Sequence, residues 1–255
     1  MRLNEDRYGY SGDFAWVIDG ATDLEPDAFL PAPSDVQWLV DRVGEHLRAA
    51  AAEGEHPGAR DILQELSGKI GEDMRSLSFP DARIHPTCSI GLMHVGPETI
   101  ELARIGDPTC IAYGDRITEL STGFFGRREA QAIELAQGAD LSDSNSREGI
   151  LRRRQNYIRG VFDESVFSGH PEAVLRIQTE SLDLGRVKHV LLCTDGFARA
   201  VVDYGIFADW SELLQQVLAS GLSSVRDRIR QHEKQTQHTA HFKRSDDVTA
   251  LLLAL

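Results

Sequence analysis

The sequence predicts an α+β protein in which antiparallel strands are grouped together rather than alternating with helices. Residues 36–47 and 62–77 carry apolar side chains at the spacing of an amphipathic helix. From residue 87 to 120 the chain becomes a series of short apolar runs, separated by turns that contain glycine. Such short connections join antiparallel neighbours and leave no room for crossover helices, so we expect an antiparallel meander.

The first predicted helix has a clear start. Ser34 is a typical N-cap residue, and Gln37 follows three positions later, as in a capping box. Both helices repeat their apolar residues on one face, which we expect to pack on the core. These residues are Val36, Leu39, Val40, Val43 and Leu47 in the first helix and Ile62, Leu63, Leu66, Ile70, Met74 and Leu77 in the second.

Further elements follow from the same patterns, and a short turn is expected around Gly9, Ser11 and Gly12. The strands expected in the meander are 87–95, 99–105, 109–113 and 116–120. Later strands are expected at 173–177, 187–194 and 248–253, and later helices at 209–219 and 223–231. No internal repeat or linker interrupts the chain, which indicates one domain over residues 1–255.

Residues 124–170 form a polar segment with candidate helices at 129–137 and 146–158. The second of these contains the basic run Arg152-Arg153-Arg154. A charge run of this kind is usually the solvated face of a helix. The alternative is a patch that receives a phosphorylated or acidic segment of a partner.

The composition limits the classes of partner. The chain has 255 residues and a formal net charge of −13, because 40 acidic residues outnumber 27 Lys and Arg. Such a surface repels nucleic acid and anionic membranes, so we expect neither as a partner. The polar, acidic start and the lack of a long apolar run argue against a signal peptide or a membrane span. Cys88, Cys110 and Cys193 form no CxxC pair and predict buried thiols in a cytoplasmic protein.

Carboxylates stand at the ends of three apolar strands. The run 14–18 ends at Asp19-Gly20, the run 190–193 ends shortly before Asp195, and an acidic pair with Asp246 precedes the last strand. Asp-Gly is a common turn dipeptide, so any one of these pairs is most simply a turn. Taken together, they predict a metal site built from carboxylates.

The order of these motifs resembles that of the metal-dependent, type 2C Ser/Thr protein phosphatases in a bacterial form. The resemblance covers nearly the whole chain. It includes an N-E-D motif near the start, a strand ending in D-G, a G-D turn, an S-D-G-like motif and an acidic segment before the last strand. The matching stretches are residues 4–6, 15–20, 106–107, 193–197 and 244–253.

The resemblance implies a central sandwich of two antiparallel β-sheets flanked by helices on both sides, a four-layer αββα fold. Residues 124–170 would then contain a variable, substrate-contacting flap. It also implies a phosphomonoester hydrolase acting on phosphoserine or phosphothreonine in proteins. The reaction would be an in-line attack on phosphorus by a water molecule activated by two Mn²⁺ or Mg²⁺ ions.

The resemblance assigns the ligands as follows. Asp19 would bridge the two ions. Glu5 and the backbone carbonyl of Gly20 would complete the ligands of one ion, and Asp195 with Asp246 those of the other. These hard oxygen ligands suit Mg²⁺ or Mn²⁺ better than zinc.

Two further acids have implied roles. Asp6 would orient the attacking water as a catalytic residue together with Asp19. Asp107 would hold a weaker third ion together with Asp195. No Cys or Ser nucleophile is required by such a reaction.

The chain departs from the family pattern at three points. Many members have a histidine after D-G as a candidate general acid, where this chain has Ala21; His85 is one stand-in. The family's phosphate-binding arginine lies three positions before the asparagine, and Arg2 is close to that place but out of register. The strand that usually precedes N-E-D has no counterpart in the sequence.

These departures keep two other readings open. One is a catalytically weak, phosphatase-like module that binds a phosphoprotein or another partner. The other is an α/β domain whose Asp-Gly pairs are only turns. Metal-dependent turnover separates the first reading from a phosphatase.

Overall fold

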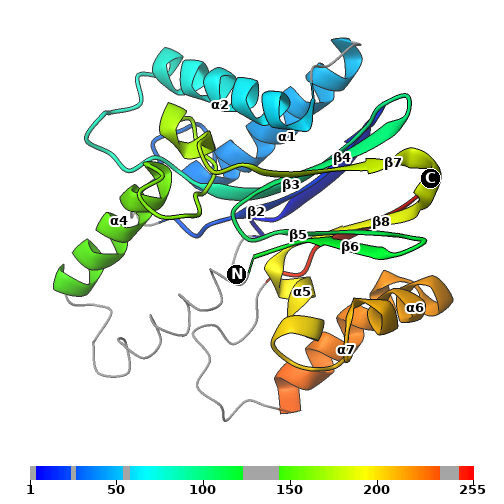
Figure 1. The fold of residues 1–255 in the computed structure, drawn as a ribbon. Coiled ribbons are helices and arrows are strands. Elements are labelled where there is room, and N and C mark those ends of the chain that lie inside the picture. Colours follow the sequence, from blue (N-terminus) through cyan, green and yellow to red (C-terminus); the bar gives the residue numbers. More distant parts are fainter. Residues whose placement is uncertain (1–3, 24–26, 54–57, 123–143, 236–246) are drawn as a thin grey trace.

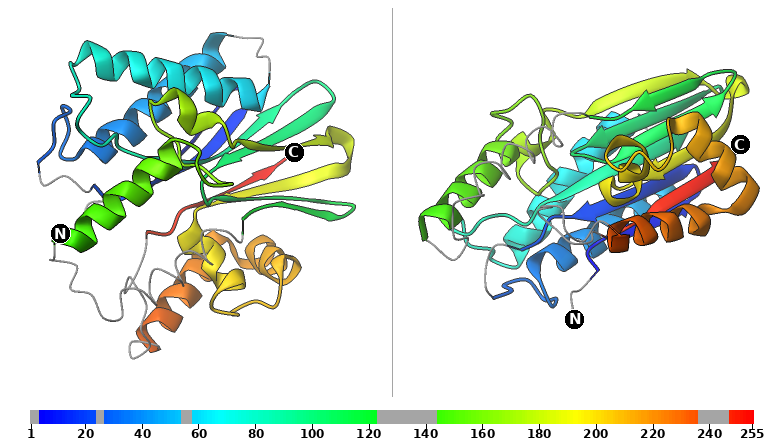
Figure 2. Two further views of the ribbon diagram at one scale, coloured as in Figure 1. Left: turned by 60° about the vertical axis from the view of Figure 1, so that its left-hand side comes forward. Right: turned by 90° about the horizontal axis from the view of Figure 1, so that it is seen from below.

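The computed structural model describes residues 4–23, 27–53, 58–122, 144–235 and 247–255. Two antiparallel sheets stack face to face, and helices cover the outer face of each (Figure 1). Turning the molecule shows the same four layers from other sides (Figure 2). The predicted αββα fold is confirmed.

The first sheet has the strand order β1-β2-β3-β4-β7. Strand β2, which lies between β1 and β3, is buried on both faces, as its unbroken apolar run predicts. Trp16 and Ile18 face the helices, while Ala15 and Val17 face the other sheet. The strands are β1 (Arg7–Ser11), β2 (Phe14–Gly20), β3 (Cys88–Val95), β4 (Thr99–Ile105) and β7 (Gln178–Asp183).

Helices α1 (Asp35–Glu53) and α2 (Ala59–Ser76) cover the first sheet with the predicted apolar faces, except that Leu77 follows the end of α2 and is exposed. The predicted N-cap is confirmed, because the Oγ of Ser34 accepts a hydrogen bond of 3.0 Å from the backbone N–H of Gln37.

The second sheet has the strand order β6-β5-β8-β9. Helices α5, α6 and α7 pack on its outer face around Phe197, Trp210 and Leu214. The strands are β5 (Thr109–Gly114), β6 (Ile117–Leu120), β8 (Val187–Cys193) and β9 (Ala250–Ala254). The helices are α5 (Asp195–Val202), α6 (Trp210–Ser220) and α7 (Leu222–Gln235).

A separate helix, α4 (Ser144–Ile158), lies beyond one end of the two sheets (Figure 1). It matches the helix predicted at 146–158, whereas the helix predicted at 129–137 lies outside the described residues. Two 3₁₀ turns, η1 (Pro171–Val174) and η2 (Leu184–Arg186), flank strand β7.

Three sequence predictions about the strands are wrong. The meander is divided between the sheets, since the turn at Gly106 carries the chain from β4 in one sheet to β5 in the other. Residues 173–177 are not a strand, because Pro171 begins a 3₁₀ turn and the strand starts only at Gln178. The stretch around Gly9 is the edge strand β1 rather than a turn.

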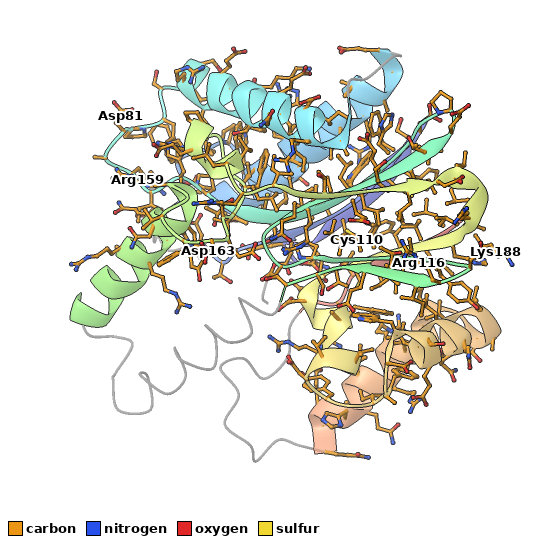
Figure 3. All side chains as sticks on the ribbon, viewed as in Figure 1. Asp81, Cys110, Arg116, Arg159, Asp163 and Lys188 are labelled. Carbon is orange, nitrogen blue, oxygen red and sulfur yellow. The ribbon has the colours of Figure 1, made fainter. Side chains whose placement is uncertain are left out.

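The three cysteines are free and buried, as predicted. Cys110 lies between the two sheets (Figure 3). Within the described ranges, no helix combines the length and the apolar character needed to span a bilayer.

Candidate active site

Strand pairing brings the N-terminal acids to Asp19. Arg7 of β1 pairs with Ile18 of β2. Continuing this antiparallel register sets Asp6 beside Asp19 and Glu5 beside Gly20. Gly20 fits this place because a Cβ there would lie 2.8 Å from both the Cβ and the backbone oxygen of Glu5. A side chain at position 20 would therefore push Glu5 away.

The turn with Asp107 packs against the next strand of the same sheet. Asp19 pairs with Ser89 of β3. Gly106 has a φ of +88°, and a Cβ on it would collide with the Ser89 side chain. The chain therefore places Asp107 at the same end of the sheet as Asp19.

A buried arginine fixes this turn. Arg104 donates a hydrogen bond to the backbone oxygen of Gly106 and forms an ion pair of 3.2 Å with Glu164. Glu164 belongs to the segment that follows α4, so Arg104 joins that segment to the end of β4. An arginine that is 1% exposed needs such partners, because an unpaired buried charge is costly.

The second sheet contributes Asp195 at the same end. Thr109 of β5 pairs with Cys193 of β8, so Asp107 and Asp195 both lie two residues beyond this pair. Asp195 is the first residue of α5, where the positive end of the helix dipole favours a carboxylate.

Thr194, which the sequence does not single out, joins the two sheets. Its Oγ1 donates a hydrogen bond of 3.2 Å to the Oδ2 of Asp6. The same oxygen accepts a hydrogen bond from the backbone N–H of Thr249, next to the last strand. Thr194 is fully buried, so these bonds fix the orientation of the Asp6 carboxylate.

The electrostatics of Asp6 are unusual. Its pKa is raised to about 7, chiefly by burial and also by the negative charges of Asp247 and Asp195, while hydrogen bonds with Thr249 and Thr194 act in the opposite direction. Asp247, the neighbour of the predicted ligand Asp246, also accepts a hydrogen bond of 3.4 Å from the backbone N–H of Glu5. The described part of the site therefore gathers several carboxylates around Asp6.

Arg199 is a second residue that the sequence does not predict. Its guanidinium lies 3.4 Å from the Oδ2 of Asp195 and 3.7 Å from that of Asp203. Four residues separate Arg199 from each acid, which is the spacing of neighbours on a helix. The signal is missed because Asp195-Gly196 is interpreted as a turn rather than as the first turn of α5.

The gathered groups fit a hard metal ion in their chemistry. They are carboxylates and a backbone carbonyl, and the raised pKa of Asp6 indicates a need for added positive charge. Among the described residues, no three His, Cys, Asp or Glu side chains form a group that could hold a metal ion. The predicted ligand Asp246 and the predicted phosphate ligand Arg2 lie outside the described residues.

A model of the family described as "Protein phosphatase 2C" matches residues 3–232. The chain belongs to this family. The match includes Glu5, Asp6, Asp19, Asp107 and Asp195 and ends before Asp246. A search among curated proteins finds no matching sequence.

Solved structures of bacterial phosphatases share the 2C fold. The Ser/Thr phosphatase Stp1 from Staphylococcus aureus is 12% identical with a TM-score of 0.58, and the match covers 100% of this chain and 90% of that one. The phosphatase PstP/Ppp from Mycobacterium tuberculosis is 13% identical with a TM-score of 0.58, covering 100% and 93%. The PstP catalytic domain in complex with two manganese ions is 12% identical with a TM-score of 0.55, covering 99% and 91%.

His85 has different neighbours from those expected of a stand-in general acid in a 2C phosphatase. Its ring packs edge-on against Phe79 and His170. Its pKa is lowered by burial and by the nearby His170, so the ring is neutral at pH 7. In the described part of the chain, its Nδ1 has no hydrogen-bond partner.

Proposed function

We propose that this 2C family member is a metal-dependent phosphomonoester hydrolase that acts on phosphoserine or phosphothreonine in proteins. The observation that carries the proposal is the convergence of Glu5, Asp6, Asp19, Asp107 and Asp195 at one end of the two sheets. These acids come from distant parts of the chain, and burial together with the charges of Asp247 and Asp195 raises the pKa of Asp6 to about 7. Structural ion pairing does not require such an arrangement.

Asp19 would bridge two Mn²⁺ or Mg²⁺ ions. Glu5 and the Gly20 carbonyl would hold one ion, and Asp195 with Asp246 the other. When bound, the ions would supply Lewis acidity that makes water a nucleophile near neutral pH and offsets charge on the phosphoryl oxygens.

The chain's own groups orient this chemistry. Thr194 holds one carboxylate oxygen of Asp6, so the carboxylate faces the site in a fixed direction. The pKa of about 7 applies to the metal-free site, and bound cations would lower it, so Asp6 would be an ionised carboxylate that orients the attacking water. Arg199 holds Asp195 from the side of α5.

The proposed third ion, held by Asp107 with Asp195, would compete with a fixed cation. The Arg199 guanidinium already interacts with Asp195. A third ion would therefore bind more weakly than the first two.

The residue after Asp19-Gly20 cannot protonate the leaving oxygen. Ala21 carries no proton to donate, and its backbone N–H is already hydrogen-bonded to the Thr87 carbonyl. We therefore propose that water protonates the leaving oxygen. Esters with a good leaving group should react faster than phosphoserine.

Hydrolysis of p-nitrophenyl phosphate tests the proposal. The purified protein is assayed with EDTA, Mg²⁺ or Mn²⁺, alongside Asp19→Asn and the matched control Asp115→Asn. Asp115 is an exposed residue of the β5–β6 turn, at the far end of the sandwich where Figure 3 labels Arg116. We expect metal-dependent turnover in the wild type and the control, and a loss of at least about 100-fold in Asp19→Asn.

Turnover in EDTA, or unchanged turnover in Asp19→Asn, would contradict the metal assignment. A folded wild type without turnover under any metal would favour the binding module instead. The missing histidine after Asp19-Gly20 is the feature that supports this second reading.

A further inference from the structure

The basic run of α4 reaches the candidate active site through one arginine. Arg154 donates a hydrogen bond of 2.9 Å from its Nη1 to the backbone oxygen of Thr22. Thr22 lies two residues beyond Gly20, in the loop that leaves β2 at the site. The contact holds α4 over the end of the sandwich seen in Figure 1.

The acidic residues that interact with Arg154 lie at the candidate active site or next to it. Burial lowers its pKa, while the carboxylates of Asp23 and Glu5 act in the opposite direction. Glu5 is a proposed metal ligand, so the guanidinium stands next to the metal site.

Two other arginines, Arg7 and Arg83, pair closely with carboxylates. Arg7 lies 2.6 Å from Asp41, and Arg83 lies 2.9 Å from Asp35. Arg154 differs: across the described ranges, its hydrogen bonding is to a backbone carbonyl, and it forms no ion pair. One bond to Thr22 uses one of the five N–H donors of a guanidinium.

A phosphate ester needs positive charge here. The protein has a net charge of −13, and its candidate site is acidic. A guanidinium matches the oxygens of a phosphate with two parallel N–H donors. When Glu5 shares its charge with a metal ion, Arg154 becomes more available to an incoming anion.

We propose that Arg154 binds the phosphate group of the substrate and holds it against the candidate active site. This inference rests on the proposed phosphatase function. It gives α4 a role in substrate binding, and it assigns to this helix the positive charge that Arg2, out of register, does not clearly supply.

The test distinguishes phosphate binding by the charge of Arg154 from a purely structural role of its hydrogen bond to Thr22. Arg154→Gln keeps an N–H donor for the Thr22 carbonyl but removes the positive charge, whereas Arg154→Lys keeps the charge. The matched control is Arg152→Ala, an exposed position on the same helix. Each Mn²⁺-loaded variant is titrated with orthophosphate by calorimetry, and KM and kcat are measured with a phosphopeptide.

We expect Arg154→Gln to weaken orthophosphate binding about 10- to 100-fold and to raise KM more than it lowers kcat, because a charge-assisted hydrogen bond is lost. Arg154→Lys should recover part of the affinity, and Arg152→Ala should behave as the wild type. If Arg154→Gln binds orthophosphate as tightly as Arg152→Ala does, the inference is wrong.

The orthophosphate titration and the hydrolysis assay can fail separately. A wild type that hydrolyses p-nitrophenyl phosphate, with unchanged orthophosphate affinity in Arg154→Gln, would overturn this inference alone. A wild type that binds orthophosphate through Arg154 without turnover would support the inference and contradict the proposed function.

Discussion

Two aspartates in different layers of the molecule show opposite electrostatic behaviour. Asp73 of α2 accepts hydrogen bonds from Arg42 at 2.7 Å and from His46 at 2.6 Å. The hydrogen bond from Arg42, followed by that from His46, holds the pKa of Asp73 below its ordinary value. Asp6, at the end of the sheets, is buried among acids, and its pKa is raised to about 7.

Under the proposed function, this difference distinguishes an acid that stabilises the fold, Asp73, from an acid of the metal site, Asp6. Asp73 already has its counter-charges, so it stabilises the contact between α1 and α2 and requires nothing more. A surface pocket of about 440 Å³ lies beside it, but its lining includes the paired Arg42 and Asp73. Asp6 has acids where Asp73 has cations, and this is the condition in which a metal ion would stabilise the fold.

The largest stability effect should come from Asp6. Its folded-state pKa of about 7 exceeds the ordinary value of 3.8, so the folded state holds a proton that the unfolded state releases. Stability of the metal-free protein should therefore fall as pH rises from about 4 to about 7, by about 1 kcal/mol per pH unit. Urea unfolding in EDTA at several pH values measures this slope.

The pH dependence of stability in the variant Asp6→Asn can be compared with that of the wild type. The variant cannot lose a proton, so in EDTA it should be more stable than the wild type at pH 8 by about 3 kcal/mol and similar to it at pH 4. Thermal or urea unfolding that shows a difference independent of pH would contradict the raised pKa.

Asp73 should give a smaller effect of opposite sign. Its lowered pKa means that its contribution to stability is present above the unfolded value of about 3.8 and is lost as pH falls through the lower folded value. Because Arg42 is partly exposed, Asp73→Asn should destabilise the protein by only about 1 kcal/mol at pH 7 and by less in high salt. Equal stability of variant and wild type in urea at pH 7 and low salt would show that the pair contributes nothing.

Much of the fold could be predicted from residue patterns. The helices α1 and α2 show strong helical periodicity and the strands β2 and β8 contain continuous apolar runs, and the structure confirms all four elements. Strand β7 was missed because it lies at a sheet edge and has few apolar residues. The edge strand β1 was missed because its tyrosines face solvent on either side of Gly9.

The site was predicted in part. The position of acids at strand ends predicts that they lie at one end of the sheets. How close they come depends on the register between strands that are far apart in sequence, such as the pairing of Asp19 with Ser89. Thr194 and Arg199 could not be found by pattern, because their roles depend on a helix that begins at Asp195 and on the neighbouring last strand.

The central claim is that acids at one end of the sandwich bind the metal ions of the reaction. Calorimetric titration of the metal-free protein with Mn²⁺, compared with Asp19→Asn and the Asp115→Asn control, tests it most directly. We expect two ions to bind the wild type and the control, and binding to be lost in Asp19→Asn because both ions share that carboxylate. Equal stoichiometry and affinity in Asp19→Asn would contradict the claim.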